Sequence, residues 1–399
     1  MSDIPSRFGN DPQPVGPLGI IAMDGCKSLG EKVNSYLVKW EKEPENADQV
    51  LLTYPGYLRS NFLLDADCPR FSSGEGKAVI RQSVRGYDLY ILCDVTNYSN
   101  TYRMYGMDVP MSPDDYFQDL KRIIAAEGKK AKRVSVIMPY LYEGRQHRRA
   151  ARESLDCAMA LQELTAMGID NIITFDAHDP RVQNAIPRSG FENVHPTYQM
   201  LKALLRKLPD LKIDRDHMMC ISPDEGAANR NIYYATMLGL DMGLFYKRRD
   251  YSVVVNGRNP IVAHEYMGES VEGKDVLIAD DILATGDSML DLARELKRRK
   301  CGRIFMATTF AMFTNGIEVF NQAYKEGLFD YILATNLNYL RPELRQQPWF
   351  IEVDMSKYIA LIIATLNHDR SISPLLNPMQ RIQNLLARHR AAQIESDQN

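Results

Sequence analysis

The stretch Gly273–Ser288 reads GKDVLIADDILATGDS and carries the clearest structural signal in the chain. Its four apolar residues Val276–Ala279 predict a buried strand, and the acids Asp280 and Asp281 stand where that strand is expected to end. The small residues that follow predict a short loop, and a helix is expected to open at Ser288. This order of strand, loop and helix is the repeating unit of α/β folds with parallel sheets.

The predicted loop, Ile282–Asp287, is suited to a phosphate group. Backbone N–H groups at a helix N-terminus point toward one place, and the helix dipole favours an anion there. Thr285 and Ser288 can add hydroxyl donors, and Gly286 lets the backbone approach closely. Two carboxylates beside a phosphate suit sugar hydroxyls or a magnesium ion rather than the phosphate itself. The whole string disfavours the alternative, a polar strand-to-helix turn without a ligand.

Apolar runs bounded by turns alternate with stretches of helical period along most of the chain. The expected strands are 88–93, 134–138, 172–175, 218–221, 242–246, 276–279, 304–308 and 331–334. The expected helices are 113–127, 154–167, 198–208, 227–238, 288–300 and 317–326. This alternation predicts an α/β protein with mostly parallel sheets.

The length of 399 residues and the number of expected strands predict two domains. A turn-rich segment at 187–190 marks the expected boundary. The predicted parts are a flexible tail (1–17), an N-terminal domain with an insertion at about 41–68 (18–187), a C-terminal domain (188–345), a helix packing back on the N-terminal domain (346–375) and a basic tail (376–399).

The composition excludes several classes of protein. Hydrophobic residues make up 45% and charged residues 25% of the chain, which excludes a mainly disordered protein. A net charge of −3 argues against nucleic acid as a partner. No apolar run approaches the length of about 20 residues that spans a membrane, so no membrane partner is expected. Six scattered cysteines indicate reduced thiols and predict a cytoplasmic protein.

The string VLIADDILATGDS resembles the phosphoribosyl-diphosphate binding motif of type I phosphoribosyltransferases and of their relatives, the ribose-phosphate diphosphokinases. Further segments resemble the diphosphokinases, in the right order along residues 18–375. They are FSSGE (71–75) with QSVRGYDLYIL (82–92), PY with GRQ (139–146), DAH (176–178), SPDEG (222–226), KRR (247–249) and ATN (334–336). The resemblance implies two tandem type I phosphoribosyltransferase-like domains, each a mostly parallel sheet flanked by helices.

The resemblance also implies a reaction. The diphosphoryl group of ATP moves to the 1-hydroxyl of ribose 5-phosphate, giving 5-phosphoribosyl 1-diphosphate and AMP, with Mg²⁺ as cofactor. It implies catalytic roles for Lys247 and Arg249, and metal binding by His178 and Asp224. The segment 250–260, which follows the catalytic pair, is predicted to be a mobile loop that closes over the reaction.

Binding roles follow from the same resemblance. Ribose 5-phosphate is assigned to Asp280, Asp281, Ala284, Thr285, Gly286, Asp287 and Ser288. ATP is assigned to Phe71, Glu75, Arg145, Gln146 and His178. In the family Phe71 and Glu75 would contact the adenine bound by a neighbouring subunit, so the resemblance predicts a homo-oligomer built from dimers, with a hexamer as one form.

Some positions depart from the family pattern. Ser73 and His147 each replace an aspartate, Glu225 and Ala227 alter the SPDEG segment, and the loop ATGDS is closer to the transferases. Three alternatives therefore stay open: a different donor or acceptor, a true phosphoribosyltransferase, or a non-catalytic regulatory subunit of an active homologue.

Overall fold

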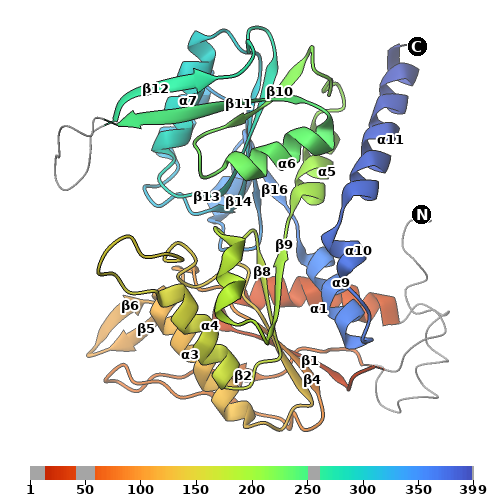
Figure 1. Cartoon of the computed structure of the whole chain (residues 1–399). Helices are drawn as coiled ribbons and strands as arrows, with labels where there is room; N and C mark the ends of the chain where they lie inside the picture. Colours follow the sequence, from red (N-terminus) through yellow and green to blue (C-terminus); the bar gives the residue numbers. More distant parts are fainter. Residues whose placement is uncertain (1–13, 42–58, 250–260, 398–399) are drawn as a thin grey trace. The chain divides into compact units, whose positions relative to one another are not determined.

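The computed structural model of this chain describes residues 14–41, 59–249 and 261–397. These residues form two compact units (Figure 1). Unit 1 runs to His195 and adds Leu337–Tyr339 and Met355–Leu376. Unit 2 contains Pro196–Asn336, Leu340–Asp354 and the chain from Asn377 onward. The α/β class predicted from the alternation is confirmed, whereas the domain limits drawn from the sequence stay a prediction.

Unit 1 is built on a five-stranded sheet in which every neighbouring pair of strands is parallel. Its order is β1-β4-β7-β8-β9. The strands are β1 (Leu18–Ala22), β4 (Asp88–Leu92), β7 (Arg133–Ile137), β8 (Asn171–Phe175) and β9 (Gly190–Val194). The three central strands are almost fully buried, as expected for a parallel sheet covered on both faces.

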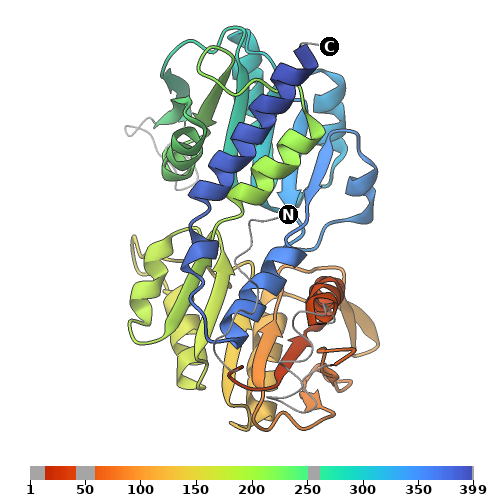
Figure 2. The same cartoon turned by 90° about the vertical axis from the view of Figure 1, so that its right-hand side faces the viewer.

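Helices cover this sheet, and they are α1 (Lys27–Glu41), α3 (Pro113–Glu127), α4 (Asp156–Ala166), α9 (Ser356–Asn367) and the short α10 (Ser373–Leu376). The prediction of a helix over 113–127 is confirmed to the residue. Ser112 and Asp115 form a capping box at its start, and Gly128 ends it in the left-handed conformation. Helices α1 and α9 pack together, although they lie far apart in the sequence (Figure 2).

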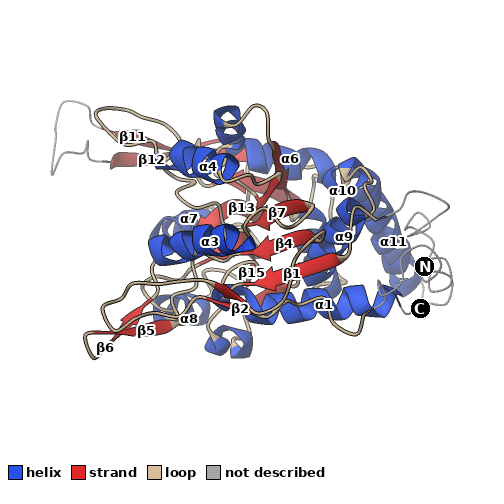
Figure 3. Cartoon of the chain, turned by 90° about the horizontal axis from the view of Figure 1, so that it is seen from below, coloured by secondary structure: helices blue, strands red, loops and turns tan. Residues whose placement is uncertain are grey.

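Two small hairpins extend unit 1. One pairs β2 (Ala66–Asp67) with β3 (Val79–Ile80), and the other pairs β5 (Thr101–Met104) with β6 (Met107–Pro110). Figure 3 shows β5 and β6 apart from the strands of the main sheet. Neither hairpin was predicted, because short, partly exposed strands carry no continuous apolar run.

Unit 2 is built on a seven-stranded sheet of order β12-β11-β10-β13-β14-β15-β16. Strand β12 is antiparallel to β11, and the other pairs are parallel. The strands are β10 (Met218–Ser222), β11 (Asp241–Arg249), β12 (Ile261–Met267), β13 (Asp275–Leu283), β14 (Ile304–Ala311), β15 (Tyr331–Thr335) and β16 (Phe350–Val353).

The helices of unit 2 are α5 (Thr197–Lys207), α6 (Ala228–Leu238), α7 (Asp287–Arg298), α8 (Glu318–Lys325) and α11 (Met379–Asp397). Short 3-10 helices lie at Asp24–Cys26, Pro180–Ala185 and Pro342–Gln346 of the chain. Most of the segment expected to be a basic tail forms α11, which packs beside α5 (Figures 1 and 2). Side chains fasten it, since Gln393 Nε2 donates to the carbonyl of Leu211 at 2.9 Å.

Strand β13 is longer than the sequence indicated. The prediction ended it at Ala279, but its pairing with β14 continues from Val276 to Leu283. Asp280 and Asp281 therefore lie inside the strand, with Asp280 opposite Thr308. The expectation that the strand ends in the two acids and is followed by a loop over Ile282–Asp287 was wrong, because β13 extends to Leu283 and α7 opens at Asp287. The physical reason is that β14 is long and fully buried, so its backbone offers partners beyond the first charged residue of β13.

Candidate functional site

Two adjacent carboxylates form the centre of the candidate site in unit 2. Asp281 is buried and Asp280 is partly buried, and both come from β13. The guanidinium of Arg230, on α6, lies 3.5 Å from Asp280 Oδ1 and 3.9 Å from Asp281 Oδ1. Burial and then the charge of Asp281 raise the pKa of Asp280 well above its usual range, and Arg230 opposes this shift.

The loop after β13 leads directly into α7. Ala284, Thr285 and Gly286 form it, and Asp287 and Ser288 open the helix. The carbonyl of Ala284 accepts from the N–H of Thr314 at 3.0 Å, which ties the loop to the segment after β14. The five residues assigned to the phosphate therefore lie in one turn at a helix N-terminus, the arrangement that favours an anion.

Gly286 is required by both conformation and space. Its φ is 89°, in the left-handed region that favours glycine. A Cβ atom built at this position would stand 2.0 Å from Cζ of Phe320, a fully buried ring. The glycine in ATGDS thus lets the loop lie against the core of unit 2.

A third carboxylate belongs to the same edge of the sheet. Asp224 follows β10, its Oδ1 accepts from the N–H of Ala227 at 3.1 Å, and its carbonyl accepts from the Ser222 hydroxyl at 2.7 Å. The charge of Asp224 contributes to the raised pKa of Asp280. Carboxyl ends of neighbouring parallel strands are where α/β sheets bind ligands.

The catalytic pair assigned from the sequence lies on β11. The backbone of Lys247 pairs with His264 and that of Arg249 with Ile261, with an irregularity between Arg248 and Arg249. The side chains of Lys247 and Arg249 lie outside the described part of the chain, as does the predicted mobile loop 250–260. The expected strand 242–246 is thus the first part of a longer strand.

The adenine-side residues lie in the turn between β2 and β3 of unit 1. Phe71 is 54% exposed, and the ammonium of Lys77 stands 5.7 Å from the centre of its ring. The hydroxyl of Ser73 donates to Glu75 at 2.8 Å. The serine that replaces the family's aspartate therefore contacts the very carboxylate assigned to adenine.

The remaining ATP-side residues come from two segments of unit 1, the one that follows β7 and the one that follows β8. His178 follows β8, and the centre of its ring lies 5.3 Å from that of His147. His147 Nε2 stands 3.6 Å from a carboxylate oxygen of Asp179. Gln146 Nε2 donates to the carbonyl of Ser154 at 2.8 Å, and Arg145 is exposed. The structure thus brings His147, noted only as a departure, beside His178.

Sequence reasoning missed two residues of the site, Arg230 and Asn231. They are consecutive polar residues near the start of α6, a position that predicts nothing but a solvated helix face. Instead, Arg230 contacts both acids of β13, and Asn231 is fully buried against the same strand. The only available signal was their place shortly after SPDEG.

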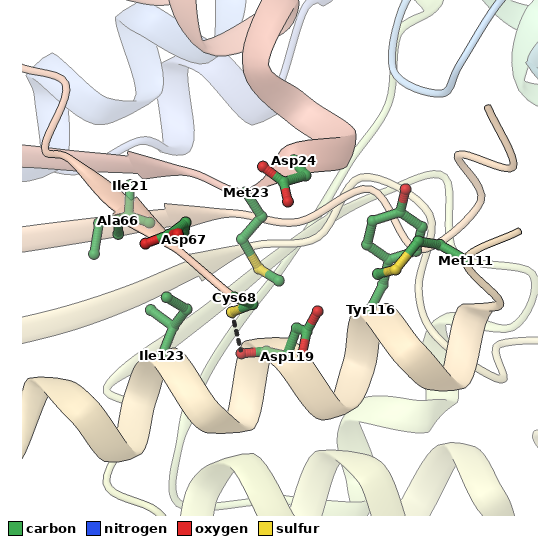
Figure 4. Close-up of a pocket in the computed structure, with 10 residues that line it drawn as sticks. All are labelled: Ile21, Met23, Asp24, Ala66, Asp67, Cys68, Met111, Tyr116, Asp119 and Ile123. Atoms are coloured by element: carbon green, nitrogen blue, oxygen red, sulfur yellow. Dashed lines mark hydrogen bonds between the residues drawn. The ribbon is translucent and has the colours of Figure 1, made fainter. Parts of the chain in front are cut away.

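Unit 1 also contains a small pocket (Figure 4). Its lining includes Met23, Cys68, Tyr116 and Asp119, and none of the site residues predicted from the sequence belongs to it. The Cys68 thiol points to the backbone carbonyl of Asp119. Burial raises the pKa of Cys68 to about 12, so this thiol is a poor nucleophile.

Within residues 14–41, 59–249 and 261–397, no three His, Cys, Asp or Glu side chains come together as a metal site. No helix in these ranges combines the length and apolar character that a membrane crossing requires.

Two family models match the chain. Residues 18–168 match the N-terminal domain of ribose phosphate pyrophosphokinase, and residues 191–324 match the phosphoribosyl transferase domain. Together the two models cover well over half of the chain.

Curated relatives and a solved structure point the same way. The ribose-phosphate pyrophosphokinase of Vibrio parahaemolyticus is 27% identical to this chain, and that of Chromobacterium violaceum is 28% identical to it. Each alignment covers 78% of this chain, with 91% and 87% of the respective relative. The crystal structure of phosphoribosylpyrophosphate synthetase from Mycobacterium smegmatis aligns with a TM-score of 0.67 at 18% identity, over 88% of this chain and 99% of that chain, and so shares the fold.

Proposed function

This chain belongs to the ribose-phosphate pyrophosphokinase family, and on that premise we propose that it transfers the diphosphoryl group of ATP to the 1-hydroxyl of ribose 5-phosphate. The products are 5-phosphoribosyl 1-diphosphate and AMP. The observation that carries the proposal is the junction of β13 and α7, where two adjacent carboxylates precede a glycine-containing turn at a helix N-terminus. A sugar phosphate needs both features: acceptors for its hydroxyls and N–H donors for its phosphate.

The proposed roles on the sugar side follow from this junction. Asp280 and Asp281 accept hydrogen bonds from the ribose hydroxyls. The 5-phosphate binds to the turn formed by residues 284–288. Lys247 and Arg249 stabilise the charge that develops on the transferring phosphates, because two cations can offset the negative charge of those groups.

On the nucleotide side, we assign ATP to Phe71, Glu75, Arg145, Gln146 and His178. The exposed ring of Phe71 is available for stacking on a base brought by a second copy of the chain. The proposal therefore includes a homo-oligomer built from dimers. It also includes a cytoplasmic location, since all six cysteines are free thiols.

A divalent cation is part of the proposal, and Mg²⁺ is the metal we assign. Mg²⁺ prefers oxygen ligands and is held by one or two carboxylates together with substrate phosphates. Asp224, which follows β10, and the two acids within β13 fit that donor set, with Asp224 as the metal-side carboxylate and His178 as the further residue assigned to the metal in unit 1. When bound, the ion would neutralise the diphosphate as it leaves AMP.

The decisive test is AMP release from ATP by purified protein with Mg²⁺ and inorganic phosphate, measured with and without ribose 5-phosphate. Sugar-dependent AMP is the expected result. AMP formed only with another sugar phosphate would indicate a different acceptor, and diphosphate released from 5-phosphoribosyl 1-diphosphate with a free base would indicate a transferase. No turnover, together with capture of an active homologue, would indicate a regulatory subunit.

A further inference from the structure

The side chain of Asn231 pairs with the backbone of β13 at a residue where the neighbouring strand β10 no longer does. The pairing of β10 with β13 ends at Ile221 and Ile278. At the next residue of β13, Ala279, the N–H donates to Asn231 Oδ1 at 3.0 Å and the carbonyl accepts from Asn231 Nδ2 at 2.7 Å. The carboxamide therefore replaces the missing backbone of β10 and continues the ladder by one residue.

The same side chain also ties α6 to the strand. Asn231 Nδ2 donates to the carbonyl of Ala227 at 2.9 Å, so both amide hydrogens and the carbonyl oxygen of this fully buried residue are used. Ala227 in turn binds the carboxylate of Asp224 through its N–H. One carboxamide thus connects the turn that carries Asp224 with the residue that directly precedes Asp280.

Arg230 acts on the carboxylates themselves. Its guanidinium reaches both Asp280 and Asp281 from the same turn of α6, and its side chain is only 16% exposed. Two carboxylates on consecutive residues repel each other, and an adjacent cation lowers that repulsion. The separations of 3.5 and 3.9 Å are those of ion pairs rather than short hydrogen bonds. Asp280 Oδ1 also accepts from the N–H of Asp281 at 2.9 Å, which helps to fix the orientation of that carboxylate.

We propose that Arg230 and Asn231 are positioning residues for the ribose 5-phosphate site: Asn231 holds the backbone of β13 at Ala279, and Arg230 holds the carboxylates of Asp280 and Asp281 in the orientation that accepts the sugar hydroxyls. This proposal rests on the proposed function. According to it, Arg230 and Asn231 of α6 raise the affinity for the sugar without touching it, by positioning the carboxylates of β13.

The test compares ribose 5-phosphate binding, measured by calorimetry, and the KM values for both substrates. Arg230→Gln removes the cation while keeping a polar side chain. The KM for ribose 5-phosphate should rise about 10- to 100-fold, the usual loss when a supporting partner is removed, whereas the KM for ATP stays within about twofold of the wild-type value. Arg230→Lys should recover most of the loss. The matched control is Arg294→Gln on α7, which breaks an exposed arginine–aspartate pair.

For Asn231, Asn231→Ala leaves the polar backbone groups of Ala279 without their partner, and Asn229→Ala on the exposed face of the same helix is the control. Hydrogen exchange at Ala279 should accelerate in Asn231→Ala and not in the control. If Asn231→Ala fails to fold, Asn231→Asp, which keeps Oδ1 and loses the two donors, takes its place.

The two proposals fail in different ways. If wild-type protein neither binds ribose 5-phosphate nor releases AMP, the proposed function is wrong. If the wild type does both and Arg230→Gln matches Arg294→Gln in sugar affinity, or if the ATP and sugar KM values rise together, the positioning role is overturned.

Discussion

Replacing Gly286 by alanine tests the loop that we assign to the phosphate. The added methyl group meets two obstacles, a backbone φ of 89° and the ring of Phe320, whose Cζ and Cε1 would stand 2.0 and 2.8 Å from the new Cβ. Phe320 cannot retreat, because it is fully buried in contact with Phe313 and Trp349. The backbone of the loop has to move instead.

The two obstacles can be given magnitudes. A non-glycine residue at positive φ costs about 1 to 2 kcal/mol, and a methyl forced into a packed core costs about 1 to 3 kcal/mol. Gly286→Ala should therefore lower the free energy of unfolding by about 2 to 5 kcal/mol. Movement of the loop also displaces the N–H groups at the start of α7, so affinity for ribose 5-phosphate should fall by about tenfold or more.

Gly273→Ala separates the cost of backbone strain at positive φ from the cost of a steric clash with a neighbouring side chain. Gly273 has a similar φ of 75°, but nothing lies within 4 Å of a Cβ built there. Urea unfolding of this control should show only the conformational cost of about 1 to 2 kcal/mol, with unchanged sugar affinity. A second comparison places Gly286→Ala in a Phe320→Leu background, where the ring atoms it meets are absent. The loss of unfolding free energy caused by Gly286→Ala should then be smaller by about 1 to 2 kcal/mol, a coupling energy typical of residues in contact.

Two results would refute this reasoning. Equal unfolding midpoints for Gly286→Ala and Gly273→Ala would show that the ring leaves room for the methyl group. Strict additivity of Gly286→Ala and Phe320→Leu would show that the collision is relieved elsewhere.

Three further predictions concern single residues. Asp281→Asn should raise the KM for ribose 5-phosphate and leave that for ATP nearly unchanged, and unchanged sugar kinetics would remove its assignment to the hydroxyls. Lys247→Ala should lower kcat by orders of magnitude with little effect on ATP affinity, because its contact belongs to the transition state; a near-wild-type kcat would contradict this. Burial raises the pKa of Asp94 to about 6, so the folded state binds this proton more tightly than the unfolded chain does. The contribution of Asp94 to stability should fall by about 2 kcal/mol as the pH rises from about 4 to 7, and urea unfolding of Asp94→Asn should lack that part of the decline. Parallel pH profiles for the two proteins would contradict the last prediction.

The interior of the fold could be predicted because its strands are buried on both faces. Strands β4, β7 and β8 read as continuous apolar runs, and the structure places them in the middle of the sheet. The edge strands β9 and β16 were missed, and both are only half-buried, so polar residues interrupt them. An edge strand needs fewer apolar residues, and periodicity alone does not separate it from a turn.

The residues of the candidate site could likewise be predicted only in part. The acids and the phosphate turn are contiguous in the chain, so one strand–loop–helix unit displays them together. Arg230 lies some fifty residues before Asp281, and the two meet only because β10 and β13 pair in parallel and α6 packs over their ends. Nothing local to Arg230 predicts a partner, because a helix start rich in polar residues is equally stable in water. The contact of Arg230 with the two acids depends on the order of strands in the sheet, which local sequence does not reveal. The contiguous motif therefore indicates what the site binds, whereas the packing of α6 determines how firmly the acids are held.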